Sequence, residues 1–297
     1  MSTKWDKKKF TSYMLWTFVI SWILQVIGSV FANKGNQMVF SLLLSVAMYG
    51  PFLGVIMAKI PLKGMGWKPQ FKGKIRYILA AWFLPAVLSI LGAILYFVIF
   101  PDRLDLTGAY LTEVAGETVI EQLKAQGITV PMYLAISSIQ AITYAPLVNM
   151  FVALGEEVGW RGAMMPMLKE RLGKSKGRIV GGIIWGAWHW PIMILAGYEY
   201  GKDYFGAPFL GLALFCLFTT VGGILLDVVY EKTQCIWVPA LAHGAINACS
   251  FVMYMVKPAY MDQLILGPMP IGIISMIPAL LVAGWLLVKE KDNVHLW

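Results

Sequence analysis

Long apolar segments separated by short polar ones run along most of the chain. Eight of them are long enough to be membrane-spanning helices, because crossing the ~30 Å hydrocarbon layer takes roughly 20 apolar residues. They lie at about residues 10–31, 38–58, 77–100, 132–156, 179–197, 207–230, 235–256 and 270–288. The pattern predicts an all-α integral membrane protein, a bundle of eight transmembrane helices that forms a single domain over residues 1–297. Its polar motifs fall in a core at about 132–256.

The composition agrees with this class and excludes others. Hydrophobic residues make up 59% of the chain and charged residues only 13%, against about 25% charged in soluble domains. Three cysteines in 297 residues are too few for a secreted disulfide scaffold. All three fall in the predicted sixth and seventh spans, and we expect Cys216, Cys235 and Cys249 to pack as unpaired, small apolar groups.

The basic residues are distributed unevenly between the two sides of the predicted bundle. Of the 24 Lys and Arg residues, 19 fall on the side that holds both termini. The other side holds Lys34, Arg103, Lys124, Lys202 and Lys257. Because positive charge collects in cytoplasmic loops, this split predicts cytoplasmic termini, and we expect a location in the bacterial plasma membrane. The net charge of +8 therefore indicates contact with anionic lipid headgroups and no nucleic-acid partner.

The first span is predicted to be retained. A positive tail precedes it, as in a signal peptide, but its apolar stretch is too long and no small-residue cleavage site follows it.

Ionisable groups inside the hydrocarbon layer are expensive, so each marks a candidate functional site. Glu157 and Arg161, at the end of the fourth span, are four residues apart and can form an ion pair on one helix face. Glu156 points about 100° away from Glu157, so the two carboxylates should do different work. A poorly solvated carboxylate can act as a general base. The alternative is an acidic helix end that lies in water.

Two histidines are predicted to lie at similar depth in the membrane. His189 is about ten residues, or ~15 Å, into the fifth span, with Trp185 one turn before it. His243 is ~12 Å into the seventh span and shares a helix face with Asn247. The third histidine, His295, is in the C-terminal tail. The alternative is that these side chains only make hydrogen bonds between helices. Together the groups favour one polar cavity that opens toward the cytoplasmic leaflet.

A weaker polar outlier is Asp227, near the cytoplasmic end of the sixth span, which we interpret as a capping or ion-pairing residue.

These motifs, taken in order, resemble a known family. Glu156-Glu157-x-x-x-Arg161, Trp185-x-x-x-His189 and His243-x-x-x-Asn247 are similar to the motifs of the CAAX protease and bacteriocin-processing family, intramembrane endopeptidases that include Rce1-like and Abi proteins. The motifs cover about a third of the chain. Trp185 stands where the family more often has Phe, which should only reshape the wall of the pocket.

The resemblance implies hydrolysis of a peptide bond in a membrane-associated peptide or protein. The substrate would be CAAX-type or similar to a bacteriocin or signal peptide, and would enter from the bilayer or the cytoplasmic side. Glu156 would activate a water that His189 positions or polarises. His243 and Asn247 would stabilise the oxyanion. Glu157 and Arg161 would support the site by holding the end of the helix and orienting Glu156.

No cofactor is favoured, and zinc is the alternative. Glu156, His189 and His243 could supply the two histidines and one carboxylate of an open zinc site. Against zinc, the chain has no His-Glu-x-x-His motif, and no carboxylate that would orient either histidine is evident.

Two other functions stay open at this stage. One is a membrane scaffold or bacteriocin-immunity protein that binds a peptide in the same cavity without cutting it. The other is a transporter or proton-coupled carrier, because buried Glu and His also serve proton relays.

Overall fold

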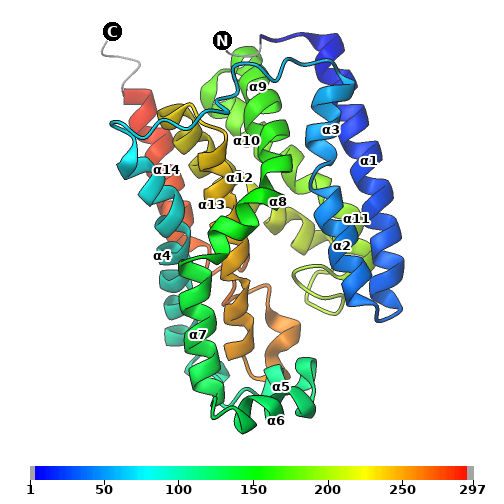
Figure 1. Cartoon of the computed structure of the whole chain (residues 1–297), viewed down its shortest axis with the longest axis vertical. Coiled ribbons are helices and arrows are strands. Elements are labelled where there is room, and N and C mark those ends of the chain that lie inside the picture. The colour runs from blue at the N-terminus through cyan, green and yellow to red at the C-terminus, as the bar shows by residue number, and fades with distance from the viewer. Residues whose placement is uncertain (1–3, 293–297) are drawn as a thin grey trace.

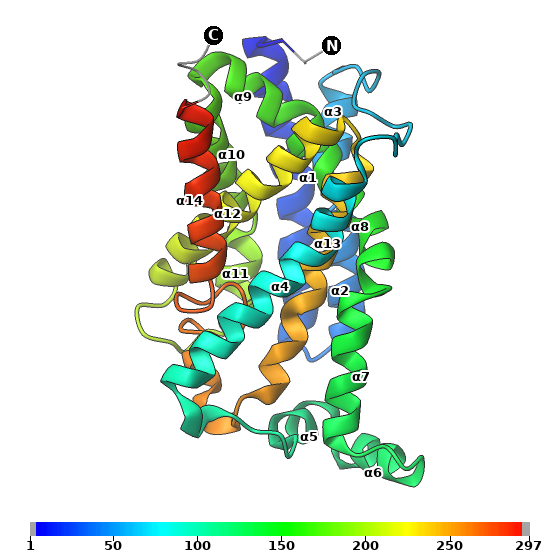
Figure 2. The same cartoon turned by 90° about the vertical axis from the view of Figure 1, so that its left-hand side faces the viewer.

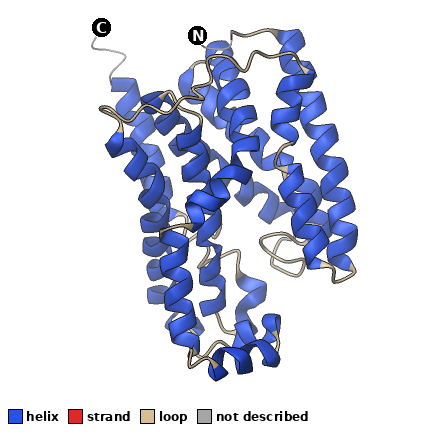
Figure 3. Cartoon of the chain, viewed as in Figure 1, coloured by secondary structure: helices blue, strands red, loops and turns tan. Residues whose placement is uncertain are grey.

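The computed structural model describes residues 4–292, so His295 lies outside the described residues. The described chain is a bundle of helices without β-strands (Figures 1 and 3). Six helices are long and apolar enough to span a membrane, and a seventh span is formed if a bent pair of helices is counted as one. The protein is therefore an integral, multi-pass membrane protein.

The helices follow one another in a simple order. The N-terminal half contains α1 (Lys7–Asn33), α2 (Gln37–Ala47), α3 (Gly50–Met57), α4 (Ile75–Ile99), the short η1 (Pro101–Arg103), α5 (Ala109–Ala115), α6 (Glu117–Ala125) and α7 (Val130–Ile142). The C-terminal half contains α8 (Ala145–Gly159), η2 (Trp160–Met164), α9 (Met165–Leu172), α10 (Lys174–Trp188), α11 (Trp190–Ala196), α12 (Phe209–Thr233), α13 (Trp237–Ala248), η3 (Cys249–Met255), η4 (Pro258–Gln263) and α14 (Ile277–Asp292).

Six of the eight predicted spans agree with the structure to within a few residues, but the predicted count of eight is not confirmed. The predicted fourth span is broken by a bend of 52° between α7 and α8. The predicted eighth span begins too early, because residues 270–276 form turns and only Ile277–Lys289 is an apolar helix. Pro268, Pro270 and Gly272 lie where this helix was expected to begin, and proline and glycine both disfavour a helix interior.

The bend between α7 and α8 has an identifiable cause. Pro146, at the start of α8, lacks an N–H group, so the helix cannot run through without a missing hydrogen bond. The indole Nε1 of Trp82 on α4 donates to the carbonyl oxygens of Ile142 (3.1 Å) and Thr143 (2.9 Å) at the break. These bonds satisfy backbone groups that hydrocarbon could not. The bend directs α8 into the centre of the bundle.

The fifth span has a break of its own at His189, between α10 and α11. Before it, α10 packs closely on α12. A Cβ atom at Gly182 would come within 2.3 Å of the Thr220 Cα, and one at Gly186 within 2.6 Å of the Cys216 Cα. Only glycine allows the backbones of α10 and α12 to come this close. Small residues at such contacts are common between helices in membranes.

Most basic residues lie at the end of the bundle that carries both termini. The segment between α3 and α4 and the helix α9, both rich in Lys and Arg, are at this end, while α5 and α6 lie at the opposite end (Figures 1 and 2). The structure thus separates the two groups of basic residues as the sequence predicts. Which end faces the cytoplasm stays a prediction.

An ion-pair network near the termini confirms the interpretation of Asp227. Its carboxylate is fully buried and lies 2.6 Å from Arg178 Nε and 2.7 Å from Lys169 Nζ. This network joins α12 to α9 and α10. The three cysteines are unpaired, as predicted.

Candidate active site

The candidate site is built mainly on two helices, α8 and α13, which pack closely against each other. Gly244 makes this approach possible, because a Cβ atom there would lie 2.6 Å from the Pro146 carbonyl oxygen and 2.7 Å from the Met150 nitrogen. Asn149 on α8 also donates to the Gly244 carbonyl at 3.3 Å. This contact places His243, the neighbour of Gly244, beside the acidic end of α8.

Glu156 is held by two tryptophans. The indole Nε1 atoms of Trp160 (2.9 Å) and Trp185 (2.6 Å) both donate to its Oε2. The side chain is only 1% exposed. Two directed donors on one oxygen fix the carboxylate, and Oε1 receives no hydrogen bond from the described residues. Glu156 is thus a buried, oriented carboxylate with one oxygen available.

Trp160 begins a π-turn, η2, directly after α8. The N–H of Met165 bonds to the carbonyl of Trp160, five residues back. Such widened turns often occur at functional sites. Glu157 and Arg161 still meet across this turn, with Arg161 Nη1 3.1 Å from Glu157 Oε1. The ion pair predicted from their spacing is present.

Glu157 differs from its predicted role, because its second partner is a histidine. His243 Nδ1 lies 2.8 Å from the Oε1 atom of Glu157. Glu157 therefore orients His243, whereas the tryptophans orient Glu156. The prediction that no carboxylate orients either histidine was wrong. It failed because residues 86 positions apart meet only through the packing of α8 on α13, which the sequence pattern does not reveal.

His189 is oriented by its own helix. Because α10 ends here, the His189 N–H bonds to Gly186 and Ala187 instead of to Trp185. The His189 Nδ1 donates to the Trp185 carbonyl at 3.0 Å. A carbonyl oxygen only accepts hydrogen bonds, so Nδ1 carries the proton and Nε2 has a free lone pair in the neutral ring.

Aromatic contacts bring these groups together. The Trp185 ring lies 5.2 Å from the His243 ring and 6.4 Å from the His189 ring, measured between centroids. On the same indole, the Arg161 guanidinium lies 4.5 Å from the ring centroid. Trp185 therefore contacts each of the three motifs, and a Phe here would lack the hydrogen bond to Glu156.

The site borders a cavity of about 490 Å³ with mixed polar and apolar walls. Trp185, His189, His243 and Asn247 line it, while Glu156 lies behind Trp185. From the histidines the cavity extends along α2 to the loop after α11 and to residues 269–271. The loop after α11 lies toward the end of the bundle opposite the termini (Figure 1). The predicted opening toward the cytoplasmic leaflet is therefore not confirmed.

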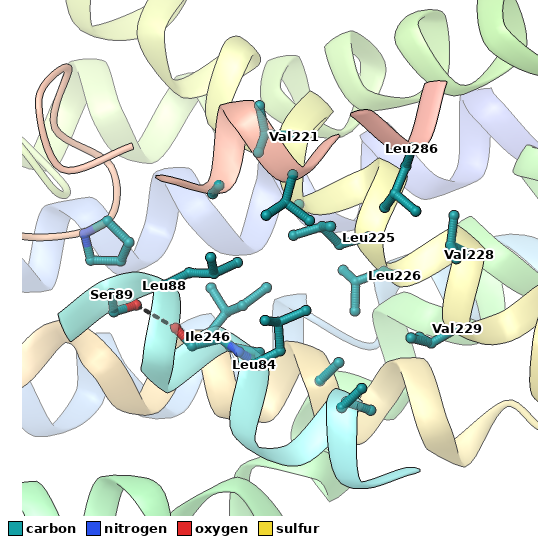
Figure 4. A pocket seen from close by; sticks show the side chains of 18 of the residues that line it. Leu84, Leu88, Ser89, Val221, Leu225, Leu226, Val228, Val229, Ile246 and Leu286 are labelled. Carbon is teal, nitrogen blue, oxygen red and sulfur yellow. Dashed lines mark hydrogen bonds between the residues drawn. The ribbon is translucent and has the colours of Figure 1, made fainter. Parts of the chain in front are cut away.

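A second cavity, of about 210 Å³, lies between α4, α12, α13 and α14 and is almost wholly apolar (Figure 4). It shares Phe218, Ile246 and Pro270 with the first cavity. These three side chains form the wall between the polar site and an apolar space suited to hydrocarbon.

Polar residues outside the motifs also line the cavity, among them Asn149 and Glu199. Asn149 lies two helical turns before Glu156 and lines the cavity, and its position in an apolar run, seven residues from Glu156, is a signal that could have identified it. Glu199 lines the same cavity from the loop after α11. No sequence pattern links it to the motifs.

The donor set does not fit a zinc site. Among residues 4–292, no three His, Cys, Asp or Glu side chains converge in a way that could hold a metal ion. The Oε2 atom of Glu156 already accepts two indole hydrogen bonds, and Glu156 does not line the cavity that His189 and His243 border. We therefore derive no step through a metal.

Fold and site together define a polytopic membrane protein with a buried acid–histidine centre. Residues 138–249 match the family described as type II CAAX prenyl endopeptidase Rce1-like. The matched range includes all three motifs, so the chain is similar to this family where the motifs resemble it. A comparison with curated proteins found no match. The family match indicates protease chemistry of the CAAX type.

Proposed function

We propose that this protein is an intramembrane endopeptidase that hydrolyses a peptide bond with a water activated by Glu156. The observation that carries the proposal is the clustering of the three motifs. Two oriented histidines and an exposed Asn line a single cavity, and the buried Glu156 carboxylate lies directly behind Trp185 in its wall. Nucleophile activation and oxyanion binding both need such groups within reach of one carbonyl.

The water is bound between Glu156 and His189. The free lone pair on His189 Nε2 accepts one of its hydrogen bonds. Glu156 removes the other proton as the oxygen attacks the peptide carbonyl carbon. When the tetrahedral intermediate collapses, the same proton passes from Glu156 to the departing amine nitrogen.

The oxyanion is stabilised by groups on α13. Asn247 lines the cavity and its amide can donate to the developing charge. Glu157 holds the His243 ring through Nδ1, and Nε2 donates to the oxyanion when both ring nitrogens carry a proton. Glu157 and Arg161 support the chemistry through His243 and do not touch the substrate.

The cavity extends toward the end of the bundle opposite the termini. Because we expect the termini to be cytoplasmic, the peptide enters from the extracytoplasmic side or from the bilayer. The substrate is a membrane-associated peptide or protein. The apolar second cavity beside the site suits a substrate that brings hydrocarbon with it.

Quantitative peptidomics tests this function. Cells express wild type or Glu156→Gln at matched levels in the membrane, and new peptide termini are compared. We expect termini that occur only with wild type, which would reveal the substrate and the scissile bond together. Identical profiles across growth conditions would contradict proteolysis and support a protein that binds peptides without cutting them.

A further inference from the structure

The loop after α11 brings a carboxylate into the active-site cavity. Glu199 lines this cavity together with His189 and His243. The loop lies outside the three motifs, and the proposed mechanism gives Glu199 no task. Its side chain is only partly exposed, and it faces the space where a substrate would bind.

The backbone holds Glu199 in an uncommon conformation. Its φ is +72°, and Gly197 (+68°) and Gly201 (+79°) flank it with positive φ as well. A residue with a side chain adopts this region only where its surroundings require it, and such residues cluster at functional sites. The loop thus orients Glu199.

Tyr198, the neighbour of Glu199, also lines the cavity. Glu199, burial and also Glu156 raise the pKa of Tyr198 well above its usual value. Trp185, which bonds to Glu156, lines the same cavity as Glu199. A peptide bound in this cavity would present one group beside Trp185 and another to Glu199.

The cavity wall holds few groups that could neutralise Glu199. Among the described residues that line it, none is Lys or Arg. Arg161 lies behind Trp185, where its charge is paired with Glu157. Lys202, three residues after Glu199, donates to Asn33 instead. Glu199 forms no ion pair within residues 4–292, and His189 and His243 are the basic groups among the described residues that line the cavity with it.

We propose that Glu199 binds a cationic group of the substrate and thereby selects peptides that are basic near the scissile bond. The group is the side chain of Lys or Arg, or a free N-terminal amine. This inference rests on the proposed endopeptidase function and names its substrate class.

A degenerate library of synthetic peptides tests this selection. The purified full-length protein in lipid vesicles is incubated with the library, and cleavage sites that depend on Glu156 are read by mass spectrometry. We expect Lys or Arg to be enriched at one fixed position beside the scissile bond, by about 10- to 100-fold over Gln, the range of a charged hydrogen bond. Each peptide is tested with a free and with an acetylated N terminus. A preference that survives acetylation comes from the Lys or Arg side chain and not from the N-terminal amine.

The variants assign this preference to Glu199. Glu199→Gln should abolish the enrichment while cleavage of neutral peptides continues, and Glu199→Lys should shift the enrichment to Asp and Glu. Asp203→Asn, which changes an exposed acidic residue of the same loop, should leave the preference unchanged.

The outcomes separate the two proposals. If wild type cuts peptides but Glu199→Gln keeps the same basic preference, the role of Glu199 is wrong and the endopeptidase function stands. If no cleavage depends on Glu156, both are overturned.

Discussion

The Nδ1 atom of His243 on α13 lies 2.8 Å from the Oε1 atom of Glu157 on α8. The same oxygen accepts Arg161 at 3.1 Å, so one carboxylate oxygen serves a fixed cation and a histidine. All three side chains are buried. A change at Glu157 or Arg161 therefore also changes the contact that orients His243.

Glu157→Gln should destabilise the fold as well as the site. It leaves the buried Arg161 without a counter-ion, which typically costs about 3–5 kcal/mol. Thermal unfolding in detergent can be followed with a thiol-reactive dye, because Cys235 and Cys249 become accessible only when their surroundings open.

The double variant Glu157→Gln/Arg161→Met is the matched control. Removing both charges should recover most of the lost stability, yet activity should stay low because His243 has lost its carboxylate. A double variant as unstable as the single one would contradict this account of the ion pair.

Gly244→Ala should force α13 away from α8. The new Cβ would meet backbone atoms at 2.6 and 2.7 Å, and overpacking of this kind costs about 1–3 kcal/mol. His243 would move with the helix, so cleavage should fall too. Gly222→Ala is the control, since its Cβ would find its nearest atoms at 3.8 and 3.9 Å. Equal melting temperatures for the two variants would argue against the close approach.

Asn247→Ala should slow catalysis without preventing binding. Loss of one oxyanion donor lowers kcat by about 10²–10³-fold, whereas KM should change little. Ser45→Ala removes another polar group from the cavity wall and should have little effect on kcat. The role of Asn247 is refuted if its variant changes KM alone.

The preference for basic peptides should depend on pH. Burial raises the pKa of Glu199 to about 7, so its carboxylate is mainly protonated below this pH and charged above it. The ratio of kcat/KM for a Lys peptide over its Gln counterpart should therefore rise from about pH 6 to about pH 8. In Glu199→Gln the ratio should stay flat. A ratio that falls with rising pH would contradict the sign of this effect.

Chelation should leave the activity intact. Dialysis against a strong zinc chelator is expected to change neither the rate of Glu156-dependent cleavage nor the melting temperature, because Glu156 is oriented by indole donors. The metal content of the purified protein, measured by mass spectrometry, gives a second readout. Loss of cleavage that added zinc restores would show that the metal-free mechanism is wrong.

Much of the fold could be predicted from apolar runs alone. Span length is imposed by the bilayer, so six spans agree with the structure to within a few residues. The errors occur where local chemistry interrupts an apolar run. Pro146 bends the fourth span, and the turns before Ile277 shorten the eighth. The apolar character of a segment is an average over about 20 residues, so it does not reveal a single proline or turn that interrupts the helix.

The site was predicted as a set of residues but not as a network. Spacing within one helix correctly gave the Glu157–Arg161 pair. The partners from other helices, such as Trp185 for Glu156 and His243 for Glu157, depend on which helix faces meet. Glu199 was missed for the same reason, because a loop residue carries no periodicity that points toward a cavity.

The π-turn sets the rotational phase between the two halves of the α8–α9 rod. On one side of it Glu156 faces the cavity wall, and on the other Lys169 reaches Asp227 at 2.7 Å. Each helical residue turns the face of the rod by about 100°. Deleting one residue within Gly162–Met164 would keep the helix continuous but turn Lys169 away from Asp227, so the ties between α9 and α12 would weaken while Arg178 on α10 kept its contact with that carboxylate.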